Sequence, residues 1–406
     1  MSDPLKSRPD DPPEGAVEET DLAPSRRREE EKRARAQEKR ERTREKVARA
    51  AERKAEVERD RRERASPSPT AEELAERTAF FERAAPHTPH LGVQIDGMTF
   101  LVATKDHKVD RALFTKRGRP EFTVLARAVA ILEGLIGPAA VRGRIFVDVG
   151  ANIGTEAIAA IRSHGFDSAV CCEPDEQTYR LLGANIALNG LETRIRALEV
   201  GASSAPGRST LVHIEGGAGN SWVAATPEQV RQAEEVRARS LARSAAGDAP
   251  EISFHEIEIE TLDRLCESGV IDPDRVGLIW LDAEGHEGHV LSGAQALVER
   301  GVPLVMEFHP KRLGRSGELA RIEDVAARCY THFVDLRRVP VEPGQPRLRL
   351  RAVADLPELA ATLLDPEISW SFTDMLLLRL EDARVPQSAD LDVLFKRAPR
   401  SKPELD

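Results

Sequence analysis

Short apolar runs alternate with helix-like stretches along the chain from about residue 140 onward. The run at 145–149 is rich in β-branched and aromatic side chains, which favours a buried strand. Gly150 and Gly154 then allow a tight turn that a Cβ atom would obstruct, and a helix-like stretch at 155–164 ends at Gly165. This order predicts a site where backbone N–H groups meet an anionic or carboxylate-bearing ligand. An ordinary strand-to-helix turn is the alternative.

The same order repeats in the residues that follow. Residues 169–172 predict a second short strand, 175–188 a helix, and 195–200 a third strand. Strands and helices in this alternation form a parallel sheet with right-handed crossovers. Because ligands in such sheets bind beyond the carboxyl ends of the strands, we expect the functional residues at those ends.

Residues 203–255 interrupt the alternation and are interpreted as an insertion. They include a predicted strand at 209–214 and a polar stretch at 227–245 that is either helical or disordered. The parallel-sheet pattern is expected to resume at 257–265. Further apolar strands are predicted at 276–281, 304–306 and 375–378.

The first 64 residues are far more polar than the rest of the chain. Residues 1–25 are rich in Pro, Asp, Glu and Ser, which predicts disorder. Residues 26–64 consist almost entirely of Arg, Lys, Glu and Ala, with acid–base pairs at helical spacing, so we expect a solvated single helix. No apolar heptad seam supports a coiled-coil dimer, and contact with an acidic surface is the alternative role. Thr70 and Glu73 form a capping-box pattern that starts the next helix.

These patterns predict the domain organisation of the chain. Within the segment ahead of the glycine turn, a strand is expected at 97–104 and an amphipathic helix at 121–135. The expected parts are a disordered and charged helical extension at 1–69, helices and a strand packing on the core at 70–140, an α/β domain at 141–380 with its insertion at about 203–255, and a disordered tail at 381–406.

Charge and composition exclude several classes of protein. The formal net charge of -10 argues against a general nucleic-acid binder, whose affinity depends on neutralising phosphates. No stretch reaches the roughly 20 apolar residues that a membrane span needs, and the N-terminus lacks a signal-peptide core. The four cysteines show no metal-ligand or redox spacing, so reduced thiols are expected. A cytoplasmic protein without a membrane span is the expectation.

Glu173 is the first candidate for ligand binding outside the glycine turn. It lies 23 residues after Gly150, at the end of the next predicted strand, where an acid can accept both hydroxyls of a ribose. A charge that stabilises a helix N-terminus is the alternative. The Gly-x-x-x-Gly spacing around Asn152 departs from the Gly-x-Gly-x-x-Gly of dinucleotide-binding folds, which disfavours NAD. Gly201 and Ala202 follow the third strand and are expected at the same edge.

The fourth predicted strand ends in Asp282-Ala-Glu284-Gly285-His286-Glu287. Three carboxylates and a histidine are costly to gather at a strand end unless a cation, a proton or a metal uses them. A solvated acidic turn is the alternative. Glu307 and His309 end the next strand and are expected to face the same crevice, although a lone histidine there is more often structural.

Taken in order, these segments resemble the FkbM family of S-adenosylmethionine-dependent methyltransferases. The resemblance covers about 140–310 and extends more weakly back to 97 and on to 380. It implies a Rossmann-like class I methyltransferase fold, an α/β fold with a mostly parallel seven-stranded sheet and one antiparallel strand near its end. The motifs are Asp148-Val-Gly-Ala-Asn-Ile-Gly154, Glu173-Pro174, Asn185-Ile-Ala-Leu-Asn-Gly190, Thr261-Leu-Asp263 and Asp282-Ala-Glu-Gly-His-Glu287.

The resemblance also implies an activity, a cofactor and residue roles. The expected reaction is O-methylation of a hydroxyl on a sugar, glycan or secondary metabolite, with S-adenosylmethionine as the cofactor. The acceptor is then a small molecule or a glycan. By the same resemblance, Asp148, Gly150, Asn152 and Gly154 hold the methionine part of the cofactor, Glu173 holds its ribose, and Gly201 and Ala202 lie near its adenine.

The expected chemistry is an in-line methyl transfer, in which positioning of the acceptor oxygen and removal of its proton matter most. Asp282, Glu284 and His309 are the candidate base and orienting groups, and Asp282 also lies beside the cofactor. A divalent metal held by Asp282, Glu284 and Glu307 is a lesser alternative. Two other classes remain open, an NAD-linked oxidoreductase and a non-catalytic scaffold that binds a partner through its charged helix.

Overall fold

The computed structural model describes residues 69–106, 109–214, 221–224, 227–244, 252–337, 348–367, 371–386 and 391. All of them belong to one compact unit, residues 65–406. The disorder expected at 1–25 and the charged helix expected at 26–64 lie outside the described residues. Of the disordered tail expected at 381–406, residues 381–386 and 391 are described and include a short 3-10 helix at Asp382–Arg384, and the rest lies outside the described residues.

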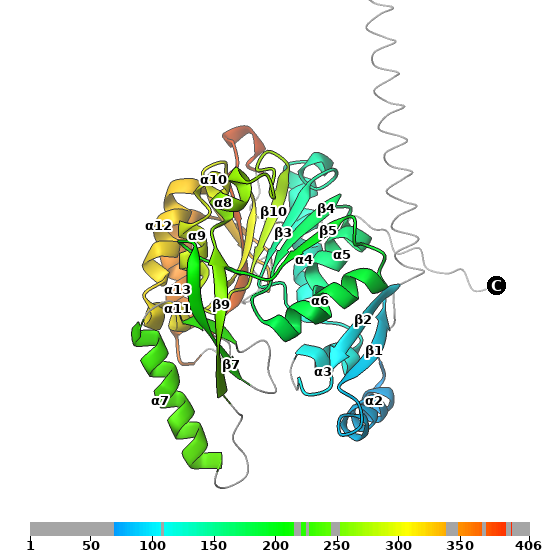
Figure 1. The fold of residues 1–406 in the computed structure, drawn as a ribbon. Helices are drawn as coiled ribbons and strands as arrows, with labels where there is room; N and C mark the ends of the chain where they lie inside the picture. Colours follow the sequence, from blue (N-terminus) through cyan, green and yellow to red (C-terminus); the bar gives the residue numbers. More distant parts are fainter. Residues whose placement is uncertain are drawn as a thin grey trace, which may run out of the picture. The chain divides into compact units, whose positions relative to one another are not determined.

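A large central sheet organises this unit (Figure 1). Its eight strands run in the order β13-β12-β14-β11-β10-β3-β4-β5. The five strands from β11 to β5 pair in parallel, which confirms the predicted parallel sheet. The strands are β3 (Ile145–Val149), β4 (Ser168–Cys172), β5 (Ile195–Leu198), β10 (Val276–Leu281), β11 (Leu304–Phe308), β12 (His332–Asp335), β13 (Leu350–Ala352) and β14 (Thr373–Leu378).

The strand count differs from the expected seven with one antiparallel strand. The sheet has eight strands, and two of them, β13 and β14, run against the rest. β14 lies between β11 and β12 and is antiparallel to both. β13 is a three-residue edge strand beside β12, too short for an alternating pattern to reveal it in the sequence.

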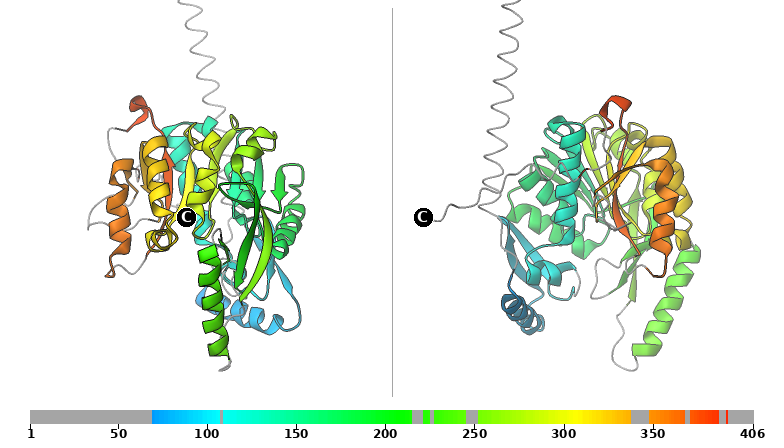
Figure 2. Two further views of the ribbon diagram at one scale, coloured as in Figure 1. Left: turned by 60° about the vertical axis from the view of Figure 1, so that its left-hand side comes forward. Right: turned by 180° about the vertical axis from the view of Figure 1, so that it is seen from behind.

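Helices cover both faces of the sheet (Figures 1 and 2). Every position of β3, β10 and β14 is buried, as expected for strands covered on both faces. Two hydrophobic clusters form the core, one on each face. The first face is covered by α4 (Pro120–Leu135), α5 (Thr155–His164) and α6 (Glu176–Leu188), and the second by α8 (Leu262–Glu267), α9 (Glu287–Ser292), α10 (Gln295–Val298), α12 (Leu319–Cys329) and α13 (Leu356–Leu364).

Local sequence chemistry sets the helix ends. α5 begins after Gly154 and ends at Gly165, and both glycines adopt left-handed backbone angles, with φ of 86° and 84°. α2 (Ala71–Ala84) begins with the expected capping box between Thr70 and Glu73. These predicted boundaries are confirmed.

A hairpin of β1 (His90–Ile95) and β2 (Met98–Ala103), with α3 (Val109–Lys116), forms a small layer beside α6. The strand predicted at 97–104 is β2, whereas its partner β1 was not predicted. Asn185 of α6 accepts a hydrogen bond from the Leu101 N–H at 2.6 Å and donates to the Ile153 carbonyl at 2.9 Å. The asparagine thereby joins the hairpin to the glycine turn.

Residues 201–260 form a second sheet, in the order β6-β9-β7-β8. The expectation that 257–265 resumes the main sheet is wrong, because 257–260 ends β9 and pairs with β7 and β6. Isoleucines and glutamates alternate there, which suits an antiparallel strand with one solvated face. The elements are β6 (Gly201–Ala202), β7 (Gly207–Ile214), β8 (Trp222–Ala224) and β9 (Ile252–Glu260), with the helix α7 (Pro227–Ser244) between β8 and β9.

Candidate active site

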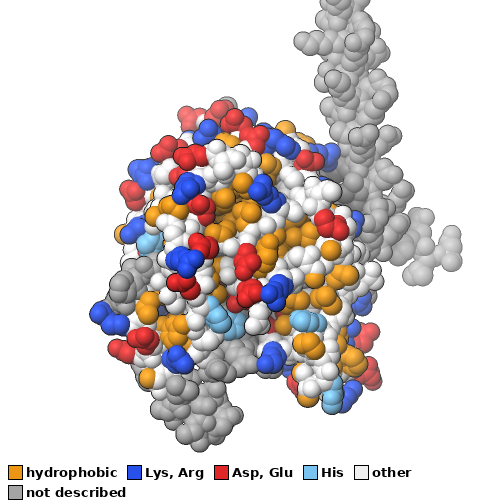
Figure 3. Space-filling model, in the orientation of Figure 1, with side chains coloured by type: hydrophobic (Ala, Val, Ile, Leu, Met, Phe, Trp, Pro, Cys, Tyr) orange, Lys and Arg blue, Asp and Glu red, His pale blue; other side chains and the backbone are white. Residues whose placement is uncertain are grey.

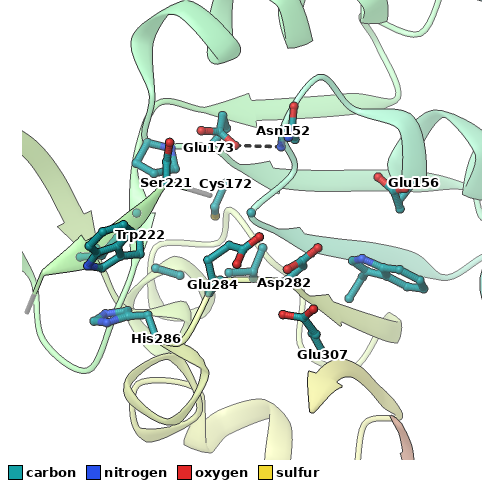
Figure 4. A pocket seen from close by; sticks show the side chains of 18 of the residues that line it. Asn152, Glu156, Cys172, Glu173, Ser221, Trp222, Asp282, Glu284, His286 and Glu307 are labelled. Atoms are coloured by element: carbon teal, nitrogen blue, oxygen red, sulfur yellow. Dashed lines mark hydrogen bonds between the residues drawn. The ribbon is translucent and has the colours of Figure 1, made fainter. Parts of the chain in front are cut away.

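The carboxyl ends of β3, β4, β10 and β11 and part of the second sheet surround a cavity of about 370 Å³, here called the inner cavity (Figure 4). Cavities of this size and position are typical of small-molecule sites in doubly wound sheets. Seven of the predicted site residues line it: Gly150, Asn152, Glu173, Gly201, Ala202, Asp282 and Glu284. The structure thus brings together residues that the sequence places on separate strands.

Gly150 lies where the turn after β3 meets the end of β10. Its φ is 80°, and a Cβ atom there would lie 1.9 Å from the backbone oxygen of Asp282. The Asp282 N–H donates a hydrogen bond to the Val149 carbonyl at 3.0 Å. Only glycine fits this close approach, so the turn itself sets the position of Asp282.

Glu173 is held in one orientation at the end of β4. The Asn152 N–H donates to Oε2 at 2.8 Å, as Figure 4 shows, and the Asp175 N–H donates to Oε1 at 2.9 Å. Burial raises the pKa of this carboxyl to about 7, although the two hydrogen bonds act in the opposite direction. Asn152 adopts a left-handed φ of 51°, which is unusual for a residue other than glycine and aims its N–H at the carboxylate.

Asp282 faces the inner cavity with an open acceptor position. Its Oδ1 atom is buried and has no hydrogen-bond partner among the described residues. Burial raises the pKa of the Asp282 carboxyl well above its ordinary value, and the carboxylates of Glu284 and Glu307 raise it further. A carboxylate with a raised pKa is a stronger base, which suits removal of a proton from a ligand.

Glu284 and Glu307 are tied together by Arg312. The Arg312 guanidinium donates a hydrogen bond from Nη1 to Glu284 Oε2, and the same nitrogen lies 3.5 Å from Glu307 Oε2. Glu284 adopts a left-handed φ of 52°, which turns its side chain into the cavity. Figure 4 shows Glu284, Asp282 and Glu307 close together.

Four further residues of the cavity wall were missed by the sequence analysis. Arg119 Nε lies 3.0 Å from Glu121 Oε2, and Arg337 Nη2 lies 3.2 Å from Glu121 Oε1. Arg337 Nε lies 2.5 Å from Asp374 Oδ2. Sequence spacing contains no trace of this chain of ion pairs, because its members come from α4 and the N-cap residue before it, the loop after β12, and β14.

Electrostatics keeps Arg119 charged but makes Asp374 easier to protonate. Burial alone would lower the pKa of Arg119, but the carboxylates of Glu156, Glu121 and Asp282 raise it, so the guanidinium remains protonated. Burial raises the pKa of Asp374 to about 7, against the opposing effect of Arg337. The wall therefore offers both hydrogen-bond donors and acceptors to a ligand.

Asp148 and Gly154 do not line the inner cavity. Asp148 lies within β3 and is 1% exposed, and burial together with the Glu156 carboxylate raises its pKa well above the ordinary value. A Cβ atom on Gly154 would lie 2.5 Å from Cδ1 of Leu182. Both residues therefore belong to the packed interior next to the turn and not to the cavity wall.

His309 lies in a different place from the one expected. Glu307 lines the inner cavity, whereas His309 lines a neighbouring cavity of about 740 Å³, here called the outer cavity. Its Nε2 lies 3.4 Å from Ser371 Oγ. His309 follows the last residue of β11, so strand alternation no longer sets its direction, and the expectation of one shared crevice is corrected.

Four further observations concern metal sites, cysteines, membrane spans and the surface. No three His, Cys, Asp or Glu side chains of the described residues are gathered so that they could hold a metal ion. The four cysteines, all in described segments, are free thiols. In the described part of the chain, no helix combines the length and the apolar character needed to cross a bilayer. Figure 3 shows acidic and basic side chains intermingled on the face drawn there.

The sheet order, the glycine turn and the inner cavity define a doubly wound α/β domain with a ligand site at its strand ends. Residues 148–329 match the family model of the methyltransferase FkbM domain. This part of the chain is therefore similar to an FkbM methyltransferase domain, which bears out the predicted resemblance, and the predicted Rossmann-like fold class is confirmed.

The methyltransferase sdnD of Sordaria araneosa is 30% identical over 157 residues, which are 36% of this chain and 59% of that protein. The chain thus spans 59% of the length of this curated relative. Among solved structures, methyltransferase FkbM from Methylobacillus flagellatus KT has a TM-score of 0.32 and 14% identity, covering 64% of this chain and 58% of that one. TYW2 of M. jannaschii in complex with AdoMet has a TM-score of 0.31 and 10% identity, and the match covers 72% of this chain and 87% of that one.

Proposed function

We propose that the protein is an S-adenosylmethionine-dependent methyltransferase that methylates a hydroxyl oxygen of a sugar, glycan or other small molecule. One observation carries the proposal: Gly150, Glu173 and Asp282 come from three strand ends and line one cavity. The FkbM domain match supports methyl transfer and this cofactor.

The residues present fit the cofactor. Glu173 is oriented by two backbone N–H groups and offers its remaining lone pairs to ribose hydroxyls. A Cβ atom on Gly201 would lie 3.3 Å from Ile257 and from Ile259, a tighter contact than most Cβ atoms make, so the glycine leaves more room beside this wall for the adenine. The orphaned Oδ1 of Asp282 is a buried acceptor that needs a partner. When bound, the cofactor supplies an electrophilic methyl group on a sulfonium.

The chain itself positions the acceptor and takes its proton. In the proposal Asp282 is the base, because its raised pKa favours uptake of the hydroxyl proton. Glu284, fixed by Arg312, orients the acceptor hydroxyl. The carboxylates around the cavity also favour a positively charged ligand. His309 remains the second candidate base, reached from the outer cavity.

Binding titrations of the full chain with S-adenosylmethionine and with NAD test the cofactor. We expect binding of S-adenosylmethionine alone, weakened about 10- to 100-fold by Glu173→Ala, as expected for lost charge-assisted hydrogen bonds. Glu176→Ala, an exposed residue of α6 paired with Arg180, is the matched control. A screen of hydroxylated acceptors with a labelled methyl donor tests the reaction. Binding of NAD instead, or of neither ligand, contradicts the proposal.

A further inference from the structure

The outer cavity adjoins the inner cavity. Trp222, Val223 and Glu284 line both, so the two spaces share a wall. In Figure 4 Trp222 stands on the side of Glu284 opposite Glu307. Most of the remaining wall of the outer cavity comes from α7 and from α11 (Pro310–Ser316). A ligand in the outer cavity therefore lies directly beside the proposed site of methyl transfer.

The side chains of α11 make the outer cavity basic. Lys311, Arg312 and Arg315 line it, and among the described residues of its wall Glu284 is the one carboxylate. Arg312 is already paired with that glutamate. Lys311 and Arg315 are one helical turn apart and exposed, and neither forms an ion pair with a described residue. Two positive charges thus remain to attract a ligand.

The rest of the wall is suited to a polar molecule of some size. α7 contributes Gln229 and Gln232, and Ser316 and Ser371 lie on the other side. Burial and the nearby arginines and lysine lower the pKa of His309, so its neutral ring provides hydrogen bonding without adding charge. A volume of about 740 Å³ lies within the range of ligand pockets.

We propose that the outer cavity holds an anionic group of the acceptor, a phosphoryl or carboxylate group, between Lys311 and Arg315, while the hydroxyl to be methylated reaches Asp282 past Trp222. This inference rests on the proposed function, and it names the substrate class: hydroxylated molecules with a negative charge. α7 and α11 then determine acceptor specificity, although none of the motifs that carry the family resemblance lies in either helix.

Anion binding can be measured without methyl transfer. Inorganic pyrophosphate and citrate, as phosphoryl and carboxylate probes, are titrated into the full chain. We expect Lys311→Glu combined with Arg315→Glu to weaken binding of the preferred probe about 10- to 100-fold, because charge-assisted contacts are replaced by repulsion. Lys116→Glu, an exposed change that lies outside both cavity walls, is the matched control. No binding of either probe, or equal binding by the variant, overturns the inference.

A second comparison uses the acceptors that the screen identifies. We expect the best acceptor to be anionic, and the double variant to raise its KM about tenfold with kcat little changed, because the charges act in binding. A neutral best acceptor, or an unchanged KM, overturns the inference. Titration of S-adenosylmethionine in the same samples separates the two proposals. Intact cofactor binding without an anion effect refutes only the outer-cavity inference, and absent cofactor binding in the unaltered chain refutes the proposed function.

Discussion

The inner and outer cavities share a wall but differ in charge. Eight carboxylate side chains and two arginines line the inner cavity, whereas two arginines and a lysine face a single carboxylate in the outer one. Several inner carboxylates, among them Glu173, Asp282 and Glu307, lie at strand ends, while the outer cations project from a short helix. We propose that the two cavities have different roles. The carboxylates of the inner cavity bind a cationic cofactor and remove the acceptor proton, and the cations of the outer cavity select the acceptor.

The largest expected effect comes from removing the proposed base of the inner cavity. We expect Asp282→Asn to lower kcat about 10²- to 10⁴-fold, because the amide cannot take the acceptor proton. Single-turnover transfer of a labelled methyl group measures the change. His309→Ala, in the outer cavity, is the matched variant and is expected to affect KM more than kcat. Full turnover by both variants would refute both candidate bases.

The glycine turn provides the second test. Gly150→Ala is expected to abolish detectable cofactor binding and to cost about 1–3 kcal/mol of unfolding free energy, because the new Cβ overlaps the Asp282 backbone in a left-handed conformation. Titration and denaturant unfolding measure both quantities. Gly183→Ala is the control, since a Cβ there meets nothing within 4 Å, and it should leave binding unchanged. Normal binding by the Gly150 variant would mean that the turn can open.

A third prediction concerns the contribution of the buried Glu287 to the pH dependence of stability. Burial raises the pKa of Glu287 to about 7. Its favourable contribution to the free energy of unfolding is therefore present below pH 4.5 and is lost as the pH rises through about 7. The free energy of unfolding of Glu287→Gln, taken relative to that of wild type, should therefore rise by about 1–3 kcal/mol between pH 4.5 and pH 8. Denaturant unfolding at both values measures the gain. A parallel pH dependence of wild type and Glu287→Gln would disprove the assignment.

The smallest expected effect is a difference between the two cavities in how strongly salt weakens ligand binding. Raising the ionic strength from about 0.05 to 0.3 M should weaken pyrophosphate binding several-fold, because exposed charges are screened. Cofactor binding in the buried inner cavity should change much less. Equal salt dependence of the two affinities, measured by titration, would show that the charge contrast has no functional consequence.

Local patterns predicted the parts of the fold that depend on local chemistry. The turn around Gly150 and the helix ending at Gly165 follow from backbone freedom, and Glu173 follows from its place after a strand. These features need only neighbouring residues, so a single sequence is sufficient to find them.

Features that depend on long-range pairing could not be predicted. Arg337 and Asp374 meet because β14 lies beside β12, a strand order that no spacing encodes. The second sheet was missed for the same reason, since β9 pairs with a strand about 45 residues earlier in the chain. The direction of His309 depends on backbone geometry after its strand ends.

Two buried asparagines set a practical limit on how the chain can be shortened. The amides of Asn185 and Asn189 exchange four hydrogen bonds with the backbone of Leu101 and Thr99. An N-terminal deletion to Thr70 leaves these bonds intact. A deletion past residue 104 removes these four bonds, and because Asn185 also donates to the Ile153 carbonyl, damage at the front of the sequence reaches the turn after β3.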